Sequence, residues 1–183
     1  MLRLLYALLL GLLGAGIVHI AILFMLPAHS ERDIWSRLSA AAPPYAMVRL
    51  GPNRLGGEIP APVNPFLTAA ACRFDLADGP VHVEAEGAVP FWSMSIYDSN
   101  GLNVFSISDR TAADGALDVV ALDPGQMQRI RGELPAEFAQ SVFIETGVEE
   151  GIVLVRAFVP DETWQGVVGR FFSGLSCTPR PVG

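Results

Sequence analysis

The sequence predicts a mainly β domain, an antiparallel sandwich or partly open barrel with a C-terminal amphipathic helix, preceded by one N-terminal transmembrane helix. Three observations predict this fold class. The chain opens with an uncharged apolar run from Leu4 to Leu26. Short segments rich in β-branched and aromatic residues then alternate with Gly, Asn, Asp and Pro turns, at a spacing typical of sandwiches and barrels. Apolar residues at helical spacing follow the last of these segments.

The composition excludes several classes of protein, including nucleic-acid binders, zinc scaffolds and multi-domain enzymes. The chain has 183 residues, a net charge of -7 and two cysteines, and all twelve of its basic residues are arginine. The absence of lysine excludes Schiff-base and P-loop chemistry. The acidic excess lies after the apolar run, where it repels nucleic acid and anionic lipid. The sequence contains no GxGxxG, HExxH, CxxC or Walker pattern, so we expect no metal and no cofactor.

Residues 1–28 predict a membrane anchor. At about 1.5 Å per residue, the run from Leu4 to Leu26 makes about 34 Å of helix, which crosses a hydrocarbon core of about 30 Å. A cleavable signal peptide has a shorter apolar region and a small residue at its end, where this sequence has Leu26. The flanking arginines leave the orientation open, but the short N-terminal tail and the cysteines favour the N-terminus inside and the bulk outside. We therefore expect an uncleaved single-pass anchor.

A stripe of small residues runs along this predicted helix. Ala7, Gly11, Ala15 and His19 recur every four residues, so they share a face that a second helix can approach closely. We expect this stripe to be a membrane-helix contact, because ionisable groups inside membranes are commonly functional. The alternative is equally favoured: small residues are common in membrane spans, and His19 can bond to a carbonyl or a water.

Residues 29–65 predict a juxtamembrane helix and an irregular connection. Ser30-Glu31-Arg32-Asp33 has the form of a capping box, and Ile34 and Leu38 lie four residues apart. We therefore expect a short amphipathic helix here, with Trp35 at the lipid interface. The glycines and prolines between positions 51 and 65 indicate an irregular connection.

Residues 66–183 predict a single β-domain. Val81, Val83 and Ala85 alternate with polar residues that include His82, which indicates a strand with one wet face. Residues 91–97 and 103–108 predict a hairpin around the turn Asp98-Ser99-Asn100-Gly101. Further strands are expected at residues 117–122, 127–131, 141–145 and 152–158.

A final helix and a pair of cysteines complete the predicted domain. Asp161 is placed to cap the helix, whose wide apolar stripe would cover an open face of the sheet and consists of Trp164, Val167, Val168, Phe171, Phe172 and Leu175. Cys177 lies just beyond it. A disulfide to Cys72 would close a loop of about a hundred residues, worth about 4 to 5 kcal/mol on the chain-entropy model, and would suit an oxidising compartment. Two unpaired buried thiols are the alternative.

The sequence resembles a bacterial family. The resemblance lies in Cys72-Arg73-Phe74-Asp75-Leu76-Ala77-Asp78-Gly79-Pro80-Val81, in Phe91-Trp92-Ser93-Met94-Ser95-Ile96-Tyr97-Asp98 and in Asn103-Val104-Phe105-Ser106-Ile107-Ser108-Asp109-Arg110-Thr111-Ala112. These runs are similar to the family catalogued as domain of unknown function 1254, in which a strand ending in Gly-Pro-Val precedes an aromatic-rich hairpin and an Arg-Thr pair.

The resemblance implies a paired envelope protein. Longer relatives fuse this module to a second one, numbered 1214 in the same catalogue, whereas short anchored forms tend to be encoded beside a similarly anchored partner. We therefore expect a bacterial inner-membrane protein whose C-terminal domain lies in the periplasm. The resemblance implies no mechanism, because the family offers no established catalytic residues to carry over.

One face of the first hairpin strand is hydroxylated and the other is apolar, by the alternation of a pleated strand. The hydroxylated face carries Ser93, Ser95 and Tyr97, and the apolar face carries Trp92, Met94 and Ile96. The hydroxylated face suits a polar ligand, although solvent-facing serines are ordinary on antiparallel sheets. Nucleophilic catalysis by these hydroxyls needs a base, and His82 is the one imidazole well inside the domain. We name no catalytic residue and keep Ser93, Tyr97 and His82 as candidate ligand-binding residues.

Arg110 completes this candidate set. Its planar fork can hold a carboxylate or phosphate through two parallel bonds, while a structural ion pair with Asp75, Asp98 or Asp109 is the favoured alternative. Asp98, Asp109 and Asp118 lie beside predicted turns, where aspartate commonly bonds to the backbone. We therefore expect neither an acid/base carboxylate pair nor a calcium site.

The predicted function is that of an interaction or assembly module, a subunit of an envelope complex with a second anchored protein. The rival is a ligand-binding or hydrolytic domain whose pocket lies between the sheet and the last helix, with Ser93, Tyr97, His82 and Arg110 near its mouth. Convergent polar groups around an apolar cavity would favour the rival, and a packed interior with an exposed apolar patch would favour the first.

Overall fold

The computed structural model describes the chain except residues 1, 52–63, 65, 113–114, 133 and 181–183. Over residues 26–33 it describes the helix backbone but not the side chains. The predicted capping box at Ser30 to Asp33 and most of the predicted irregular connection therefore lie outside what is described.

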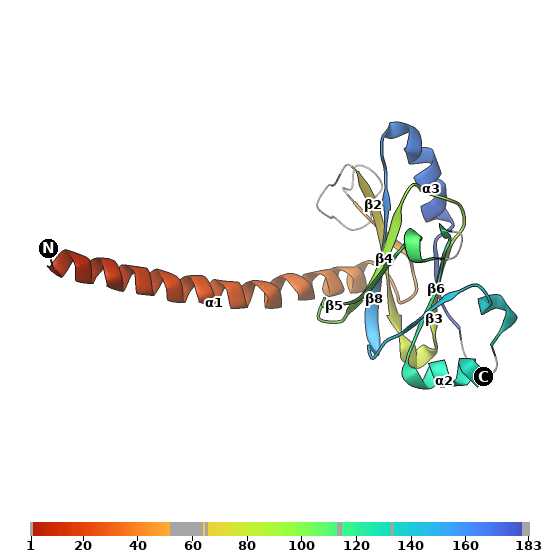
Figure 1. The fold of residues 1–183 in the computed structure, drawn as a ribbon, viewed down its shortest axis with the longest axis horizontal. Coiled ribbons are helices and arrows are strands. Elements are labelled where there is room, and N and C mark those ends of the chain that lie inside the picture. The colour runs from red at the N-terminus through yellow and green to blue at the C-terminus, as the bar shows by residue number, and fades with distance from the viewer. Residues whose placement is uncertain (1, 52–63, 65, 113–114, 133, 181–183) are drawn as a thin grey trace.

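The chain begins with one long helix, α1, which spans Leu2–Ala41 (Figure 1). Its part from Leu2 to Met25 has a mean hydropathy of 2.5, and none of it is buried against the rest of the chain. A helix of this length and composition is apolar enough to span a membrane or to serve as a signal sequence. The helix predicted after the apolar run is present but continuous with it, because the backbone stays helical through Pro27 to Ala41.

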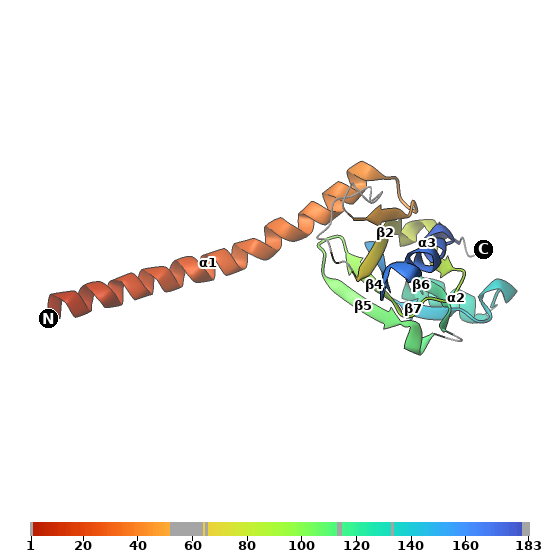
Figure 2. The ribbon, with the colours of Figure 1, turned by 90° about the horizontal axis from the view of Figure 1, so that it is seen from above.

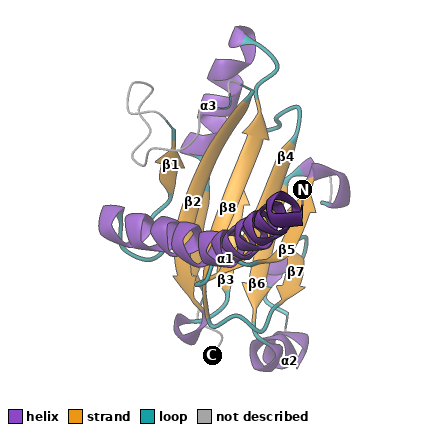
Figure 3. Cartoon of the chain, turned by 90° about the vertical axis from the view of Figure 1, so that its left-hand side faces the viewer, coloured by secondary structure: helices purple, strands orange, loops and turns teal. Residues whose placement is uncertain are grey.

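The last turns of α1 pack on the β-domain. Leu38 is buried with Val48, Ala71 and Ile152 on the outer face of a sheet, and α1 crosses that face in Figure 3. Trp35 lies against the domain, where the guanidinium of Arg73 lies 5.5 Å from the centre of its ring; its predicted place at the lipid interface stays a prediction. The helix end is thus fixed to the domain by apolar contact and a cation–π contact.

The larger of two sheets has five antiparallel strands in the order β1-β2-β8-β4-β5. The strands are β1 (Val48–Leu50), β2 (Leu67–Asp75), β8 (Glu150–Phe158), β4 (Trp92–Asp98) and β5 (Asn103–Ser108). The smaller sheet has the order β7-β6-β3-β9 and contains β7 (Val142–Glu145), β6 (Leu117–Leu122), β3 (Val81–Ala85) and β9 (Ser176–Pro179). Within it β6 and β7 run parallel, and the other pairs are antiparallel.

The two sheets enclose one core, so the fold is an open sandwich (Figure 2). Alternate residues of each strand meet in it, for example Met94 of β4 and Val83 of β3, as expected of two facing sheets. The predicted disulfide is present: Cys72 on β2 is joined to Cys177 on β9. This bond ties the larger sheet to the smaller one.

Most of the predicted strands are confirmed, and three strands were not predicted. The hairpin β4–β5, β3 and β6 lie where the sequence placed them, and β7 and β8 agree within two residues. The strands β1, β2 and β9 were not predicted as such. Gly79 and Pro80 do not end a strand, because β2 ends at Asp75 and a 3-10 turn, η2 (Leu76–Asp78), separates it from β3.

The strand predicted at 127–131 is wrong, because these residues belong to the helix α2 (Pro124–Gly132). The backbone amide of Gln126 donates to Oδ1 of Asp123, and the Asp123 amide donates back to Oε1 of Gln126. This is a reciprocal capping box that starts a helix. Met127 and Ile130, three residues apart, are buried against Phe138 of the 3-10 turn η5 (Ala136–Phe138).

The predicted amphipathic helix exists, but it is not the last element. Asp161 caps the 3-10 turn η6 (Glu162–Trp164), which leads into α3 (Gln165–Ser173). Val168, Phe171 and Phe172 reach the core, and Arg49 of β1 donates to the carbonyl of Gly169. The chain then returns as β9 beside β3, so Cys177 lies in a strand rather than in a tail.

Candidate functional site

The two faces of β4 are divided as predicted. Trp92, Met94 and Ile96 are fully buried in the core. Ser93, Ser95 and Tyr97 lie on the outer face of the five-stranded sheet, and Tyr97 packs beside the cluster around Leu38. The hydroxylated face is therefore the one that α1 crosses (Figure 3).

An arginine that the sequence analysis did not single out joins these hydroxyls. Nη2 of Arg156, on β8, donates to the Tyr97 phenol oxygen at 3.0 Å, and Nη1 donates to Ser95 Oγ at 3.5 Å. Ser106 of β5 donates to Ser95 Oγ at 3.0 Å, and the Asn103 amide donates to Ser106 at 3.0 Å. We call Ser95, Tyr97, Asn103, Ser106 and Arg156 the Arg156 cluster. It joins three neighbouring strands through side chains.

The Arg156 cluster changes the acidity of its phenol. Burial raises the pKa of Tyr97, but the hydrogen bond and positive charge of Arg156 outweigh this effect and lower the pKa from its ordinary 10.0. Hydrogen bonds from Asn103 and Ser95 act in the same direction. The cluster is thus an environment that favours negative charge.

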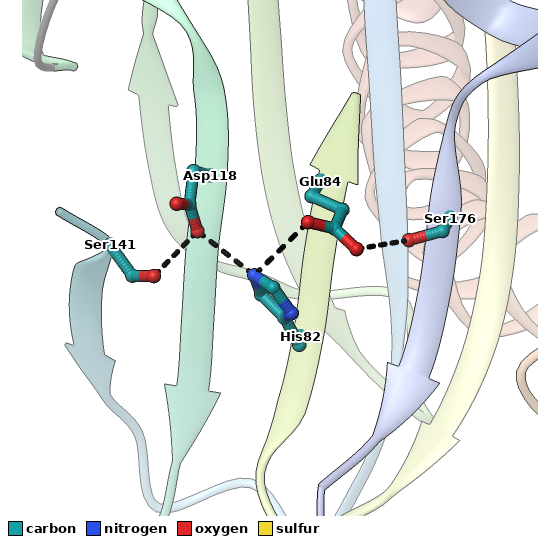
Figure 4. A network of polar contacts seen from close by, with 5 residues as sticks. All are labelled: His82, Glu84, Asp118, Ser141 and Ser176. Atoms are coloured by element: carbon teal, nitrogen blue, oxygen red, sulfur yellow. Dashed lines mark hydrogen bonds and ion pairs between the residues drawn. The ribbon is translucent and has the colours of Figure 1, made fainter. Parts of the chain in front are cut away.

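The predicted His82 lies in a different place, on the outer face of the smaller sheet (Figure 4). The predicted wet face of this strand is exposed at Glu84, whose side chain is 47% exposed, but not at His82, because Phe138 covers the imidazole edge-on at 5.3 Å and leaves His82 4% exposed. Nε2 of His82 lies 2.9 Å from Oδ1 of Asp118, and Ser141 donates to the same oxygen at 2.6 Å. Nδ1 of His82 is buried without a hydrogen-bond partner.

This arrangement contains serine, histidine and aspartate but is not a nucleophilic triad. In such a triad the serine hydroxyl bonds to the imidazole, which removes its proton, and the aspartate holds the other ring nitrogen. Here Ser141 and His82 both point at the Asp118 carboxylate. Ser141 therefore lacks the imidazole base of a triad, and the array acts as a structural link between β3, β6 and the start of β7.

The four predicted ligand-binding residues do not converge. Ser93 and Tyr97 share the outer face of the larger sheet, whereas His82 lies on the other sheet. Arg110 is exposed in the 3-10 turn η3 (Asp109–Thr111), and within the described chain it has no ion pair with Asp75, Asp98 or Asp109. The pairing expected for Arg110 is absent, and Arg156 rather than Arg110 contacts the hydroxyls.

The predicted turn role of aspartate holds for Asp98, whose Oδ1 accepts from the backbone amides of Asn100 and Leu102. It is wrong for Asp118, which lies within β6 and binds side chains. Over the described residues, no group of three or more histidine, cysteine or carboxylate side chains could hold a metal ion.

A shallow hollow of about 500 Å³ lies at the end of the sandwich where η2, the start of α2 and the β7–β8 connection meet. Its lining includes the acidic residues Asp75, Asp123, Glu149 and Glu150. It is not the predicted pocket between the sheet and the last helix, and it contains none of the four predicted ligand-binding residues.

Among the described strands, the outer strand β5 has a free edge. It pairs with β4 on one side, and its sequence Asn-Val-Phe-Ser-Ile-Ser has neither charge nor proline. We call the free side of β5, with the exposed Leu102, Val104 and Phe105, the β5 edge. Charges, prolines and short length normally protect edge strands from pairing. The other outer strands, β1, β7 and β9, have three or four residues, against six in β5.

The small-residue stripe of α1 is exposed along its length. Ala7, Gly11, Ala15 and His19 have no neighbour in the described chain that covers them. A side chain added at Gly11 would meet nothing within 4 Å.

Comparison with known proteins gives a family and a fold. The model of the family described as "Protein of unknown function (DUF1254)" matches residues 55–179. The VPA0106 protein from Vibrio parahaemolyticus aligns with 85% of this chain and 39% of its own, with a TM-score of 0.57 and 13% sequence identity. A putative uncharacterized protein from Burkholderia cenocepacia aligns with 70% of this chain and 37% of its own, with a TM-score of 0.45 and 16% identity. This chain therefore matches about two fifths of the length of each of these solved chains. No curated protein matches it.

Proposed function

We propose, because this chain belongs to the family described as "Protein of unknown function (DUF1254)", that it is a membrane-anchored periplasmic interaction module. In this proposal α1 holds the domain at a bacterial inner membrane as a single-pass anchor. The domain binds a second anchored protein of an envelope complex along the β5 edge. The stripe of Ala7, Gly11, Ala15 and His19 is a second contact, within the membrane.

The β5 edge is the observation that carries the proposal. The free edge of a six-residue uncharged strand offers a row of backbone donors and acceptors to an incoming strand. Val104 and Phe105 are 39% and 37% exposed, and Leu102 at the hairpin end is 64% exposed. A partner that adds an extended, uncharged segment would pair this backbone and cover these side chains together.

The partner is proposed to be a different protein with its own anchor. The solved chain from Vibrio parahaemolyticus continues well beyond the shared fold, which covers 39% of it. The resemblance noted in the sequence implies that short anchored forms have an anchored partner. A second chain would then supply the module that longer relatives carry in the same chain. Two helices side by side in the bilayer would also bring the partner to the domain at high effective concentration.

The rival function has less support from the described geometry. Its proposed residues Ser93, Tyr97, His82 and Arg110 lie on three separate surfaces. The interior between the sheet and α3 is filled by Phe171, Phe172 and their neighbours.

Photo-crosslinking in native membranes tests the proposal. A photo-crosslinking amino acid replaces Val104 in the full chain, and a matched chain carries it at Leu134, which is 52% exposed and distant from β5 in sequence. We expect a cross-link from position 104 to an extended segment of one other membrane-spanning protein, and none from 134. The variant Phe105→Lys should abolish that cross-link, because a charge on an edge strand disfavours pairing.

Three results would overturn the proposal. They are a cross-link between two copies of this chain, equal labelling from positions 104 and 134, and no cross-link at all. Gly11→Leu tests the stripe separately. It should weaken co-purification of the cross-linked partner in mild detergent, because a large side chain keeps the helices apart.

A further inference from the structure

We propose that the Arg156 cluster is a binding site for a phosphoryl group. The site lies on the outer face of the five-stranded sheet, between the docked end of α1 and β5. Arg156 supplies the positive charge, and the hydroxyls of Tyr97 and its neighbours supply further hydrogen bonds. This site can exist whether or not the domain binds a partner protein. If its ligand is a lipid, the proposal also rests on the proposed function of α1 as a membrane anchor.

Arg156 has donors to spare. A guanidinium has five N–H groups, and two of them donate within the cluster, to Tyr97 and to Ser95. The Ser95 bond, at 3.5 Å, is at the limit of a hydrogen bond. The other three N–H groups have no acceptor among the described residues. This set includes paired N–H groups of the kind that hold a phosphate through parallel bonds.

The charge of Arg156 is also unpaired. Over the described residues, no carboxylate forms a salt bridge with it. The neighbouring arginine on this face, Arg73, is already used, since its Nη2 donates to the Ala42 carbonyl and its guanidinium lies over Trp35. A half-buried guanidinium without a counterion has lost part of its hydration. An anion that pairs with it should therefore bind more tightly than at a fully exposed arginine.

Hydroxyl groups surround this charge. The Tyr97 phenol accepts from Arg156 and also lies within hydrogen-bond reach of Asn103 and Ser95. Ser93 and Ser108 face each other across the β4–β5 pair on the same face. A phosphoryl group has more acceptor oxygens than a carboxylate and can use both the guanidinium fork and these hydroxyls, which favours it as the ligand class.

The site faces along α1 toward the N-terminal end of that helix (Figures 1 and 3). If α1 spans the membrane, this sheet face is turned to the bilayer. Trp35 and Leu38, where α1 meets the sheet, lie about 15 to 20 Å beyond Met25 at about 1.5 Å per residue. The headgroup layer occupies about 5 to 7 Å of that distance. A water-soluble phosphate ester reaches a site at this height directly, whereas a lipid headgroup reaches it only where the sheet face lies against the bilayer surface.

The net charge of the chain does not oppose this assignment. Its value of -7 weakens long-range attraction to an anionic surface. Binding through Arg156 is a contact of hydrogen-bond length, which is screened far less than interactions beyond about 8 to 10 Å.

The test uses 19F NMR of the full chain with fluorotyrosine, in which Tyr97→Phe identifies the Tyr97 signal. In a phosphate-free detergent such as dodecyl maltoside, inorganic phosphate should shift this signal with saturation, and acetate should shift it less. Arg156→Gln should weaken phosphate binding about tenfold or more, since a charge-assisted bond is lost. Arg156→Lys should fall between, and Arg110→Gln, an exposed arginine outside the cluster, should bind as the unmodified chain does.

A second arm places the chain in phospholipid nanodiscs. A Tyr97 signal that is already at its phosphate-bound position there, and returns in Arg156→Gln, supports the site and assigns the ligand to a lipid headgroup. A signal that moves only when phosphate is added supports the site and assigns a soluble phosphate ester. No saturable shift in either medium, an equal response to acetate, or unchanged binding in Arg156→Gln with the near-ultraviolet signal of Trp92 intact would overturn the proposal. None of these results depends on the β5 edge.

Discussion

Cys72 and Cys177 join the two sheets of the sandwich through a disulfide in the core, which runs from β2 of the larger sheet to the edge strand β9 of the smaller one. Both residues are buried, at 0% and 3% exposure. They lie 105 residues apart in the chain, so the bond closes most of the domain into one loop. The chain has two cysteines, so this is its one disulfide.

Replacing both cysteines by alanine should lower the free energy of unfolding by about 4 to 5 kcal/mol, because the open chain regains the entropy that the loop removes. Denaturant unfolding of the full chain in detergent, followed by the fluorescence of buried Trp92, measures this change. Reduction of the unmodified chain should give the same loss. A double variant as stable as the disulfide-bonded chain would contradict the prediction.

Gly151 is required by a close approach of backbone and ring. It lies in β8, where an added Cβ would come within 2.6 Å of both the Tyr97 carbonyl oxygen and the Phe74 ring. The Tyr97 oxygen belongs to the paired backbone of β4 and cannot turn away. Gly151→Ala should therefore cost about 1 to 3 kcal/mol of unfolding free energy.

Gly147→Ala is the matched control for this prediction, since a Cβ at Gly147 would meet nothing within 4 Å. Its unfolding free energy should stay within about 0.5 kcal/mol of the unmodified chain. Equal losses for the two variants would show that the contact at Gly151 is not the cause.

The pH dependence of the unfolding free energy should show the ionisation of the Tyr45 phenol. Burial raises the pKa of this phenol to about 12 and the Asp78 carboxylate adds to the rise, while the hydrogen bond with the Asp75 backbone opposes it. Because the folded pKa lies above the unfolded value of about 10, this stabilisation is complete below pH 10 and is lost as the pH rises through 12. Tyr45→Phe should lower stability by about 1 kcal/mol at pH 8.

The difference between Tyr45→Phe and the unmodified chain should shrink between pH 10 and pH 12. Thermal unfolding at a series of pH values measures it. A constant difference across this range would mean that the pKa of Tyr45 is not higher in the folded chain than in the unfolded one.

The strands that the sequence predicted are those with one clear pattern. The period-two alternation in 81–85 and the Asn-Gly turn between β4 and β5 each indicate their structure locally. The strand β2 lacks this signal because it is rich in alanine and is covered on both faces, by the core at Cys72 and by α1 at Ala71. A strand buried on both sides does not alternate.

The helix α2 could have been predicted, since Asp123 and Gln126 are spaced as a capping box and Pro124 fits the first helical turn. The short strand β9 could not, because its place beside β3 is set by the disulfide and by packing between distant segments.

The candidate site was less accessible to sequence reasoning than the fold. The hydroxylated face of β4 follows from alternation, but nothing near Arg156 in the sequence distinguishes it from eleven other arginines. It joins Tyr97 because β8 pairs with β4, and that pairing spans 59 residues. The burial of His82 likewise depends on Phe138, which is supplied by a turn far along the chain.

The array on the smaller sheet should be structural and not catalytic. Ser141 donates to the weakly basic Asp118 carboxylate instead of to His82, so its hydroxyl lacks the imidazole that activates a nucleophilic serine. A fluorophosphonate probe that labels activated serines should leave the folded chain unmodified. Labelling that is lost in Ser141→Ala would contradict this prediction and revive the hydrolytic alternative.

Removing the imidazole should cost much more stability than removing the neighbouring carboxylate. His82→Ala opens a cavity under Phe138 and deprives Asp118 of one of its two donors, which should lower the unfolding free energy by about 2 to 4 kcal/mol. Glu84 lies 3.9 Å from the same ring nitrogen, but its side chain is 47% exposed. Glu84→Gln should therefore change stability by less than about 1 kcal/mol. Denaturant unfolding at pH 7 compares the two variants, and similar losses would show that His82 contributes through its exposed neighbour and not through the buried bond to Asp118.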